Sequence, residues 1–506
     1  MDRRRFIAGT AGAVTTASLF SNHTFAQTQK RGGILRLGMS ASSTTDTLDP
    51  ISYLDINTFA MGFTLGNNLV EMTPEKGPVP ELAEEWDSSD KSSRWAFRIR
   101  KGVEFHNGKT LTPSDVVYSI NRHRSESSKS LSKSFLANVT DIRADGQNVV
   151  IEMSQGDADM PAIMALWGMQ ITPEGFEDWG NYVGTGPYQL ERFEAGKIFS
   201  GKRNQNYWKD DRAWFDGVEF TAIPDLQERE QALLSGSVDG IDRVNFLVFD
   251  RFKQDPSYQT VESEGARFVT LAMDVRKKPY SDPNVREALK YCVARQDIID
   301  KVLGYATVAN DHPVPATDPF HHSELPQRPY DPKRARRLLG DAGFDLLRLR
   351  LSASETAFAG GLDTATLMQD YAAAGNIDLR ITQENPDGYW SNVWMKKPFI
   401  ESFWNMRPTP AMMFGVAFTC GGPSAEAYWC NDQFMSALAA ARVETDFQQR
   451  KQHFWDMQEI CHRDSGNIIP AFMSDLDIFS NKLGGIGKDR FSRLLGLRIA
   501  ERAWFA

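Results

Sequence analysis

The pattern of apolar and polar residues along the chain predicts a mixed α/β protein. Charged and apolar residues alternate from Arg94 to Arg100, which places Trp95, Phe97 and Ile99 on one face of a strand. Further strands are expected over residues 33–37, 149–153, 188–193, 218–223, 267–274 and 468–472. Apolar residues at helical spacing predict helices over residues 57–71, 113–122, 226–234, 432–442 and 446–463, with others starting after Pro283 and Pro332.

The start of the helix at residue 113 has a clear local signature. Thr112 is a cap residue, Pro113 takes the first helical position, and Asp115 is the acid three residues after the cap. These residue types satisfy the free N–H groups at a helix start, so we expect the helix to begin there.

The first 26 residues have the order of an export signal: a charged start, a weakly apolar stretch over residues 8–20, and small residues at Thr24-Phe25-Ala26. The stretch is shorter and more polar than the roughly 20 apolar residues of a membrane span, so we expect cleavage after Ala26. The paired arginines before Phe6 resemble the twin-arginine signal, which would make that machinery the export partner; an ordinary secretion signal is the alternative. No cysteine near the cleavage site offers a lipid anchor, so we expect a free periplasmic protein of a Gram-negative cell.

The net charge and the length of the chain limit its possible partners and its number of lobes. The chain has 57 Lys+Arg and 66 Asp+Glu, and removal of the signal shifts its formal charge from -9 to about -11. A mildly acidic surface argues against nucleic acid or an anionic membrane as partner. About 480 mature residues exceed what one hydrophobic core organises, so two or three lobes are expected.

All four cysteines lie in the second half of the chain. Cys420 and Cys430 flank a Gly-Gly-Pro turn that can bring their sulfurs together, and in an oxidising compartment we expect them bonded. Cys292 and Cys461 lie among apolar residues in helical patterns and are expected to be buried free thiols; a metal site at Cys461-His462 is the alternative.

The sequence has few signs of catalytic chemistry. It contains no Gly-x-Ser-x-Gly, His-Glu-x-x-His or Cys-x-x-Cys motif, and Gly184-Thr185-Gly186 is followed by a proline that disrupts a dinucleotide-binding helix. His312, His321 and His322 could form a metal cluster, but their segment is rich in Pro, Asp and Ser and is more typical of an exposed loop. We therefore expect no enzyme activity, no cofactor and no metal.

Aromatic residues are concentrated in the second half of the chain: Tyr389, Trp390, Trp394, Phe399, Phe403, Trp404, Phe414, Phe418, Tyr428 and Trp429. Most are expected to be buried in a core, but Trp and Tyr at a cleft can also enclose a small ligand. Arg407 stands near them in a Pro-flanked loop, where its guanidinium could receive a carboxylate. The alternative is a surface arginine paired with a neighbouring acid.

An ordered set of short motifs resembles the extracellular solute-binding proteins of peptide and nickel ABC importers, family 5, over essentially the whole mature chain. The motifs are Gly32-Gly33-Ile34-Leu35, Leu48-Asp49-Pro50, Pro80 to Trp86, Trp95 to Gly108, Thr112 to Ser119, Gly184 to Tyr188, Arg203-Asn204, Tyr207-Trp208, Leu234 to Gly240 and Asp282 to Leu289.

The resemblance implies a periplasmic binding protein fold of two hinged α/β lobes with an extra domain on the first lobe. By the family pattern, lobe I would comprise residues 27–60, 184–268 and 475–506, the extra domain residues 61–183, and lobe II residues 269–474. A similar cysteine loop in dipeptide-binding relatives supports the bond between Cys420 and Cys430. Closure of the lobes on a ligand would create the form that the importer permease recognises.

At one position this sequence differs from its peptide-binding relatives in a way that affects the expected ligand. Peptide-binding relatives often have an aspartate for the ligand's ammonium a few residues after the tryptophan that matches Trp404, whereas this chain reads Asn405-Met406-Arg407. We expect the ligand to present a carboxylate there, although another acid such as Asp387 could take the ammonium. The cleft residues predicted from matching positions and chemistry are Tyr53, Trp390, Trp404, Asn405, Met406, Arg407 and Phe418.

The expected function is therefore capture of a peptide or peptide-like solute by a monomeric binding protein that delivers it to an ABC permease. The sequence does not name the ligand: a peptide, an opine-like conjugate, a sugar and a metal chelate all fit this fold. A sensor or chaperone-like binding protein on the same fold, or an exported enzyme, is the alternative.

Overall fold

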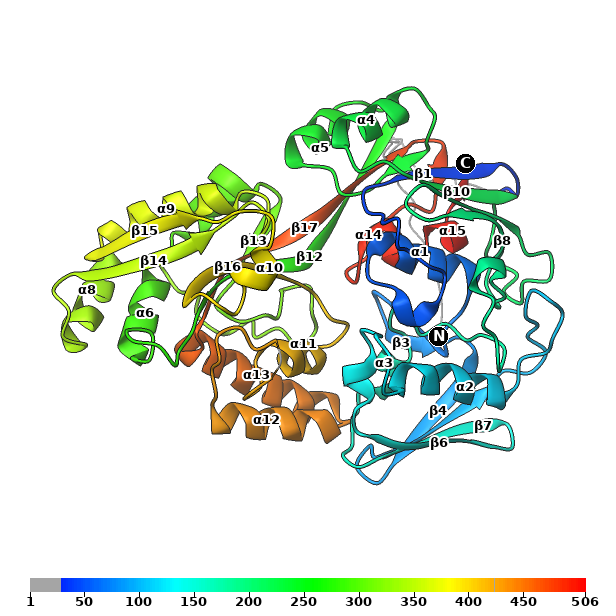
Figure 1. Cartoon of the computed structure of the whole chain (residues 1–506), viewed down its shortest axis with the longest axis horizontal. Helices are drawn as coiled ribbons and strands as arrows, with labels where there is room; N and C mark the ends of the chain where they lie inside the picture. The colour runs from blue at the N-terminus through cyan, green and yellow to red at the C-terminus, as the bar shows by residue number, and fades with distance from the viewer. Residues whose placement is uncertain (1–28, 423) are drawn as a thin grey trace, which may run out of the picture.

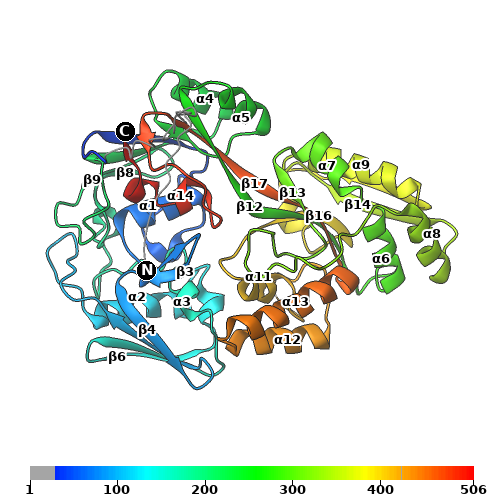
Figure 2. The same cartoon turned by 180° about the vertical axis from the view of Figure 1, so that it is seen from behind.

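Two long antiparallel strands, β12 (Tyr258–Met273) and β17 (Asn467–Ser480), connect two lobes. The computed structural model describes residues 29–422 and 424–506, so the expected signal segment, residues 1–26, lies outside the described residues. Figure 1 and Figure 2 show the two strands running side by side from one lobe to the other.

The two strands form the middle of one large sheet. Its strand order is β15 (Ile377–Gln383), β14 (Leu347–Ala353), β16 (Phe399–Asn405), β12, β17, β11 (Gly240–Ile241), β1 (Ile34–Met39), β10 (Gly217–Ala222), β9 (Ile198–Arg203) and β8 (Tyr188–Glu194), while β13 (Ala306–Val308) also pairs with β17. The first part of this order lies in lobe II and the last part in lobe I (Figure 1). The expected mixed α/β fold is confirmed.

Lobe I is built from both ends of the chain. Its helices are α1 (Ile56–Leu65), α4 (Leu226–Leu234) and α5 (Phe246–Lys253), and the C-terminal segment adds β18 (Leu483–Gly484), α14 (Arg493–Gly496), α15 (Ile499–Arg502) and β19 (Trp504–Phe505). Its core joins Leu37 of β1 and Phe63 of α1 to Ile499 of α15. Helix α1 crosses the boundary expected at residue 60 and packs as one unit in this core.

The extra domain is a separate layer below lobe I in Figure 1. It contains the sheet β4 (Ala83–Ser89), β5 (Arg94–Ile99), β7 (Asn148–Met153), β6 (Val139–Asp145), the hairpin β2 (Val70–Thr73) and β3 (Gly77–Pro80), and helices α2 (Pro113–Arg124) and α3 (Met160–Ile163). Trp95, Phe97 and Ile99 are all buried on one face, as the alternation predicts. The cap of α2 is also confirmed, since the Thr112 N–H donates to the Asp115 carboxylate over 2.8 Å.

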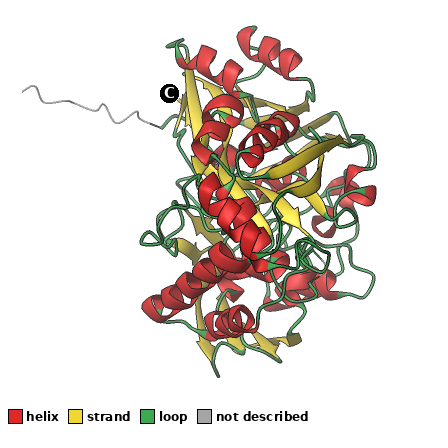
Figure 3. Ribbon diagram, turned by 90° about the vertical axis from the view of Figure 1, so that its left-hand side faces the viewer, coloured by secondary structure: helices red, strands yellow, loops and turns green. Residues whose placement is uncertain are grey.

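Lobe II contains the remaining helices: α6 (Pro283–Tyr291), α7 (Arg295–Ile298), α8 (Pro332–Asp341), α9 (Gly361–Ala373), α10 (Tyr389–Asn392), α11 (Pro410–Ala417), α12 (Asp432–Val443) and α13 (Phe447–Asp464). Seen from this lobe's side, helices lie in front of the strands (Figure 3). Cys292 and Cys461 are buried and free, and Cys420 and Cys430 form a disulfide, as predicted. None of the described helices is both long and apolar enough to span a bilayer.

The helix predicted over residues 57–71 is too long at its C-terminal end. Helix α1 ends at Leu65 and β2 begins at Val70. The chain turns because Gly184 and Gly186 pack directly against the backbone of Leu65, where an added Cβ at Gly184 would lie 2.2 Å from the Leu65 oxygen. The buried Asn68 N–H then donates to Glu81 over 3.1 Å, so the residues after α1 follow tertiary contacts instead of helical periodicity.

A bulge in β12 marks the junction between the lobes. The register with β17 shifts between Ser263 and Arg267; residues before the shift pair with the lobe I half of β17, and residues after it pair with the lobe II half. Gly265, within the shift, has a φ of 72°, which favours glycine. A change of backbone angles at this bulge is the simplest way for the lobes to rotate.

Buried ion pairs stabilise the lobe I side of this junction. Arg493 donates from Nε to Asp475 of β17 over 3.1 Å and lies 3.3 Å from Asp242. Arg267, the first residue after the bulge, lies 3.3 Å from the same Asp475. The carboxylate of Asp475 therefore joins the hinge of β12 to the C-terminal segment.

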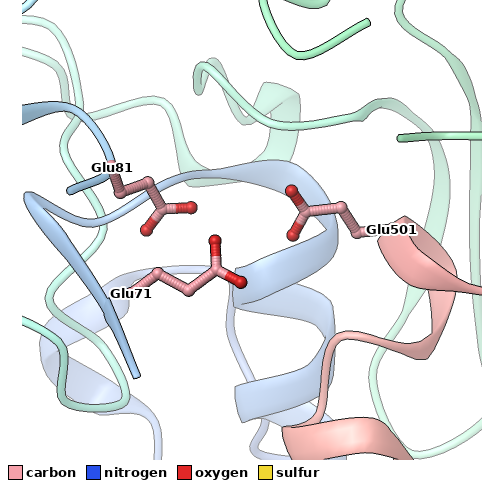
Figure 4. A group of neighbouring side chains, drawn as sticks. All are labelled: Glu71, Glu81 and Glu501. Atoms are coloured by element: carbon pink, nitrogen blue, oxygen red, sulfur yellow. The ribbon is translucent and has the colours of Figure 1, made fainter. Parts of the chain in front are cut away.

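Three buried carboxylates meet where the C-terminal segment contacts the extra domain. Figure 4 shows Glu71, Glu81 and Glu501 pointing toward one another, and an oxygen of each lies within 4.8 Å of the others. Such a group could hold a metal, but Lys209 Nζ lies 3.0, 2.8 and 2.8 Å from the three in that order. Arg498 pairs with Glu81 over 2.8 Å and Arg502 pairs with Glu71 over 2.7 Å. Three cations thus balance three acids, and the arrangement is a buried ion-pair network.

Glu501→Gln should lower the free energy of unfolding at pH 7 by about 3 kcal/mol, because it leaves the buried Lys209 and Arg498 undercompensated. Burial alone would raise the pKa of Glu501, but Lys209 and Arg498 lower it to about 2. The stabilisation is therefore present above about pH 4.5 and is lost as the pH falls toward 2. Urea unfolding at several pH values measures both effects.

The matched control is Glu85→Gln. Glu85 is exposed and pairs with the exposed Arg98 over 2.9 Å, so its loss should cost less than about 1 kcal/mol. Equal losses for Glu85→Gln and Glu501→Gln would contradict a stabilising role for the buried network.

Candidate functional site

A cavity of about 690 Å³ lies between the extra domain and lobe II. This volume is in the usual range for a small-molecule site, roughly 300–1,000 Å³. The extra domain contributes Arg124, Val139, Leu166, Trp167 and the loop of residues 130–137, and lobe II contributes Trp404, Arg407, Val416 and Ser424.

A smaller cavity, of about 50 Å³, adjoins it and brings in lobe I. Leu166, Trp167 and Arg407 line both cavities, while the smaller one adds Phe63, Met72, Ala165, Met406, Pro408, Asp489, Arg490, Phe491, Ser492, Gly496 and Arg498. Arg407 is therefore at the point where lobe I, the extra domain and lobe II meet.

The loop that carries Arg407 is attached directly to the hinge. Strand β16 ends at Asn405, which pairs with Arg267 of β12, and the next N–H, of Met406, donates to the Ala266 carbonyl in the bulge over 3.0 Å. On the other side, Thr409 caps helix α11. A rotation at the bulge therefore moves Arg407 with it.

Arg407 has no acidic partner among the described residues. Its Nη1 donates to the Asn405 carbonyl of its own loop over 2.8 Å, and it takes part in none of the ion pairs of the described chain. Burial lowers the pKa of its guanidinium to about 10. The charge is thus partly desolvated without a paired acid, and such a guanidinium gains from contact with an anionic group.

Among the described residues, no acid lines the larger cavity. In the smaller cavity the one carboxylate is Asp489, which is buried and lies 3.3 Å from Arg502. Neither wall offers a free acid for an ammonium group, in agreement with the absence of an acid in Asn405-Met406-Arg407. Asp387 is exposed and lines neither cavity.

The position of the Trp404 ring depends on a buried acid. Glu426 accepts from Trp404 Nε1 over 3.2 Å, from Trp394 Nε1 over 2.8 Å and from Asn467 Nδ2 over 3.2 Å. Burial raises the pKa of Glu426, and the hydrogen bonds from the two indoles lower it in part. An indole N–H can only donate a hydrogen bond, so each of the two tryptophans of lobe II needs an acceptor. The Glu426 carboxylate is that acceptor for both, and it thereby fixes the positions of their rings.

The seven predicted site residues fall into three groups. Trp404, Met406 and Arg407 line the two cavities, and Asn405 is exposed beside them, with its carbonyl bonded to Arg407.

Trp390 is 40% exposed and packs edge-on against Phe403, outside both cavities. Tyr53 lies in the lobe I core, where its hydroxyl donates to the Leu48 carbonyl, and Phe418 lies in a lobe II core.

Several lining residues carry no signal that sequence reasoning used. Lys133 is in a polar stretch that reads as an ordinary surface loop, and Trp167 is in an irregular apolar segment. Glu426 lies inside the loop between Cys420 and Cys430, and no motif marks it there. The positions of Lys133 and Trp167 in the cavity become visible only when the extra domain and lobe II face each other, whereas Glu426 is identified by its hydrogen bonds to Trp394 and Trp404.

The histidine segment does not form a metal cluster in the described part of the chain. His312 is fully buried, His321 Nδ1 bonds the Val314 carbonyl, and His322 stacks on Trp455 at 4.1 Å. These residues belong to the packing of lobe II, and the exposed loop expected for them is wrong for His312 and His322, which are both buried.

A third cavity, of about 610 Å³, is lined by residues of α4, α9 and the lobe I half of β17. Its charges are mixed: the lining contains the cations Arg229, Arg243, Arg267 and Lys301 and the acids Glu355 and Asp363. Arg267 is already paired with Asp475. The cavity of about 690 Å³ between the extra domain and lobe II, which Arg407 lines, is therefore the stronger candidate for ligand binding.

Comparison with known proteins agrees with the two-lobed architecture. The model of "Bacterial extracellular solute-binding proteins, family 5 Middle" matches residues 77–425. Heme-binding protein A of Haemophilus influenzae is 29% identical over 55% of this chain and 56% of its own length. The dipeptide-binding protein of Escherichia coli is 24% identical over 92% of this chain and 98% of its own length.

Among solved structures, the binding protein AgaA in complex with agropinic acid, from A. tumefaciens R10, has a TM-score of 0.78 at 21% identity and covers 94% of this chain and 99% of its own. All three relatives are named as binding proteins.

Arg407→Gln should leave the melting temperature of the ligand-free protein unchanged or slightly higher, because it removes a partly desolvated charge that no acid compensates. Arg493→Gln is the contrast: it breaks buried pairs with Asp475 and Asp242 and should cost roughly 3–5 kcal/mol. Thermal unfolding of both variants without ligand makes the comparison. A large loss for Arg407→Gln would identify Arg407 as a structural residue.

Proposed function

Since this chain belongs to the bacterial extracellular solute-binding proteins of family 5 and is a substrate-binding component of an ABC importer, we propose that it captures a peptide-like solute whose carboxylate binds Arg407. The observation that carries this proposal is the uncompensated guanidinium of Arg407 in a cavity between the extra domain and lobe II. The fold supplies two lobes joined by two strands, and the cavity contains no motif of catalysis.

The mechanism that we propose is closure at the bulge in β12. Without ligand the protein populates an open form; a ligand that contacts both sides of the cavity favours the closed form, and the permease recognises that form. The hydrogen bond from Met406 to Ala266 links the hinge to the loop of Arg407. Binding is then a shift of population, and the ligand is released chemically unchanged.

A carboxylated solute that is not a peptide is the second candidate. The absence of an acid in the larger cavity favours it, because a free ammonium would have no partner there. AgaA, whose printed ligand is agropinic acid, shares this fold. An N-blocked peptide and an opine-like conjugate both satisfy the same requirement, whereas a free-amino dipeptide does not.

The proposed location is the periplasm, with the mature monomer exported through the twin-arginine machinery. The arginine pair in the first residues and the family membership support this location. A sensor role on the same fold would differ in one respect: no permease would recognise the closed form.

N-acetyl-Ala-Ala should bind more tightly than free-amino Ala-Ala and should raise the melting temperature of mature protein. At about 100 times its dissociation constant a ligand adds roughly 2.7 kcal/mol of stability. Small-angle X-ray scattering should show a smaller radius of gyration at saturation. Arg407→Gln should weaken binding by about tenfold or more, the value of a charge-assisted hydrogen bond.

Lys129→Gln is the matched control, since Lys129 is an exposed cation that lines neither cavity. Tighter binding of free-amino Ala-Ala than of its acetylated form would retain the transport function and reject the role given to Arg407.

A further inference from the structure

The cavity wall opposite lobe II comes from one loop of the extra domain, between α2 and β6. This loop contains the 3₁₀ turn Lys133–Leu136 and contributes Lys133 to the lining, next to Arg124 at the end of α2. The same cavity is lined by Arg407 from lobe II. Positive side chains therefore face it from both sides.

The cations of this loop are bonded to neutral partners only. Lys133 Nζ donates to the Glu126 carbonyl over 2.7 Å, and Arg124 Nη1 donates to Asn121 Oδ1 over 2.7 Å. Neither makes an ion pair with a described acid within 4 Å, although burial lowers the pKa of Arg124 and the more distant Asp141 raises it in part. Neither cation therefore has a paired acid among the described residues, and the same holds for Arg407.

Hydroxyl groups and aromatic rings complete the wall. Ser130, Ser132, Ser134 and Ser424 line it, and the rings of Trp167 and Trp404 give it apolar surface. Serine hydroxyls can donate to an anionic oxygen, and indole rings cover the apolar part of a small solute. An acid-free cavity with three cations and four serines suits a ligand with more than one negative charge.

We propose that the ligand carries a second anionic group, a carboxylate or a phosphoryl group, which Lys133 binds while Arg407 binds the first. This inference rests on the proposed function and defines its substrate class as dianionic solutes. The extra domain then forms part of the binding site. A dianion also offsets the mutual repulsion of Lys133, Arg124 and Arg407, which opposes approach of lobe II to the extra domain when the cavity is empty.

Three N-blocked dipeptides that differ in their second anionic group test the second anchor by isothermal titration calorimetry. N-acetyl-Ala-Ala carries only its C-terminal carboxylate, N-succinyl-Ala-Ala adds a second carboxylate, and N-acetyl-phosphoseryl-alanine adds a phosphoryl group on its first side chain. We expect at least one of the two peptides with a second anionic group to bind about tenfold more tightly than N-acetyl-Ala-Ala. The tighter of the two identifies which anionic group Lys133 prefers.

Lys133→Gln should bring the affinity of the peptide with the second anionic group close to the affinity that the same variant has for N-acetyl-Ala-Ala. Lys133→Arg, which keeps the charge, should restore the difference between the two affinities, and Lys129→Gln should change neither affinity because Lys129 does not line the cavity. The variants are chosen at Lys133 since Arg124 also bonds the Val139 carbonyl, so its removal would disturb the domain.

The experiment distinguishes a failure of the second anchor from a failure of the proposed function. Equal affinity for all three peptides, or a dianion advantage that survives in Lys133→Gln, would overturn the second anchor and leave the proposed function in place. Binding of none of the three would overturn the peptide-like ligand of the proposed function together with this inference.

Discussion

The arrangement of the whole molecule depends on the pairing of β12 with β17. The two strands carry the sheet from one lobe to the other, and their ladder shifts register at the bulge between Ser263 and Arg267 and again between Val269 and Leu271. A ladder of backbone hydrogen bonds resists stretching but allows twisting where a residue is unpaired. The lobes are therefore held at a fixed separation and are free mainly to rotate.

The restriction of the lobes to rotation also determines how the candidate site can move. Arg407 follows β16, which is paired with β12, and its neighbour Met406 bonds the bulge itself. When the lobes rotate at the hinge, the guanidinium of Arg407 therefore moves together with lobe II. Ion pairs around Asp475 stabilise the lobe I half of the hinge strands. They also stabilise the adjoining turn, in which Leu494, Leu495 and Leu497 have positive φ values. Such backbone costs about 1–2 kcal/mol per residue, so the surrounding bonds are needed to keep it.

Much of the fold was predictable because its elements have strong local signals. The helix over residues 226–234 and the start of α2 at Pro113 match the structure, as do the buried residues of β5. The hinge strands were predicted only in part, since the lobe I half of β17 carries Asp475 and Asp477, whose burial depends on Arg493 and a distant turn. Strand β14 and helix α9 had no expectation at all, because their short patterns are ambiguous without tertiary contacts.

The same distinction applies to the site. Arg407 could be selected from sequence because a Pro-flanked loop and a missing acid are local features. Lys133 and Glu426 could not, since a lysine in a serine-rich loop and an isolated glutamate acquire their roles only from the residues that face them. Tyr53 shows why an aromatic residue is ambiguous in a sequence: its ring suits a core as well as a cleft, and here it lies in the lobe I core, where the Leu48 carbonyl accepts its hydrogen bond.

The ion-pair network at Glu501 has a consequence for how the protein is made. Glu71 and Glu81 are translated early, whereas Arg498, Glu501 and Arg502 are among the last residues of the chain. Strand β1 likewise lies beside β11, which pairs with the late strand β17. The N-terminal part of lobe I therefore cannot complete its core until residues 498–502 have been synthesised. Both of its halves must then fold together, so lobe I is completed only after lobe II, which lies between them in the sequence, has been made.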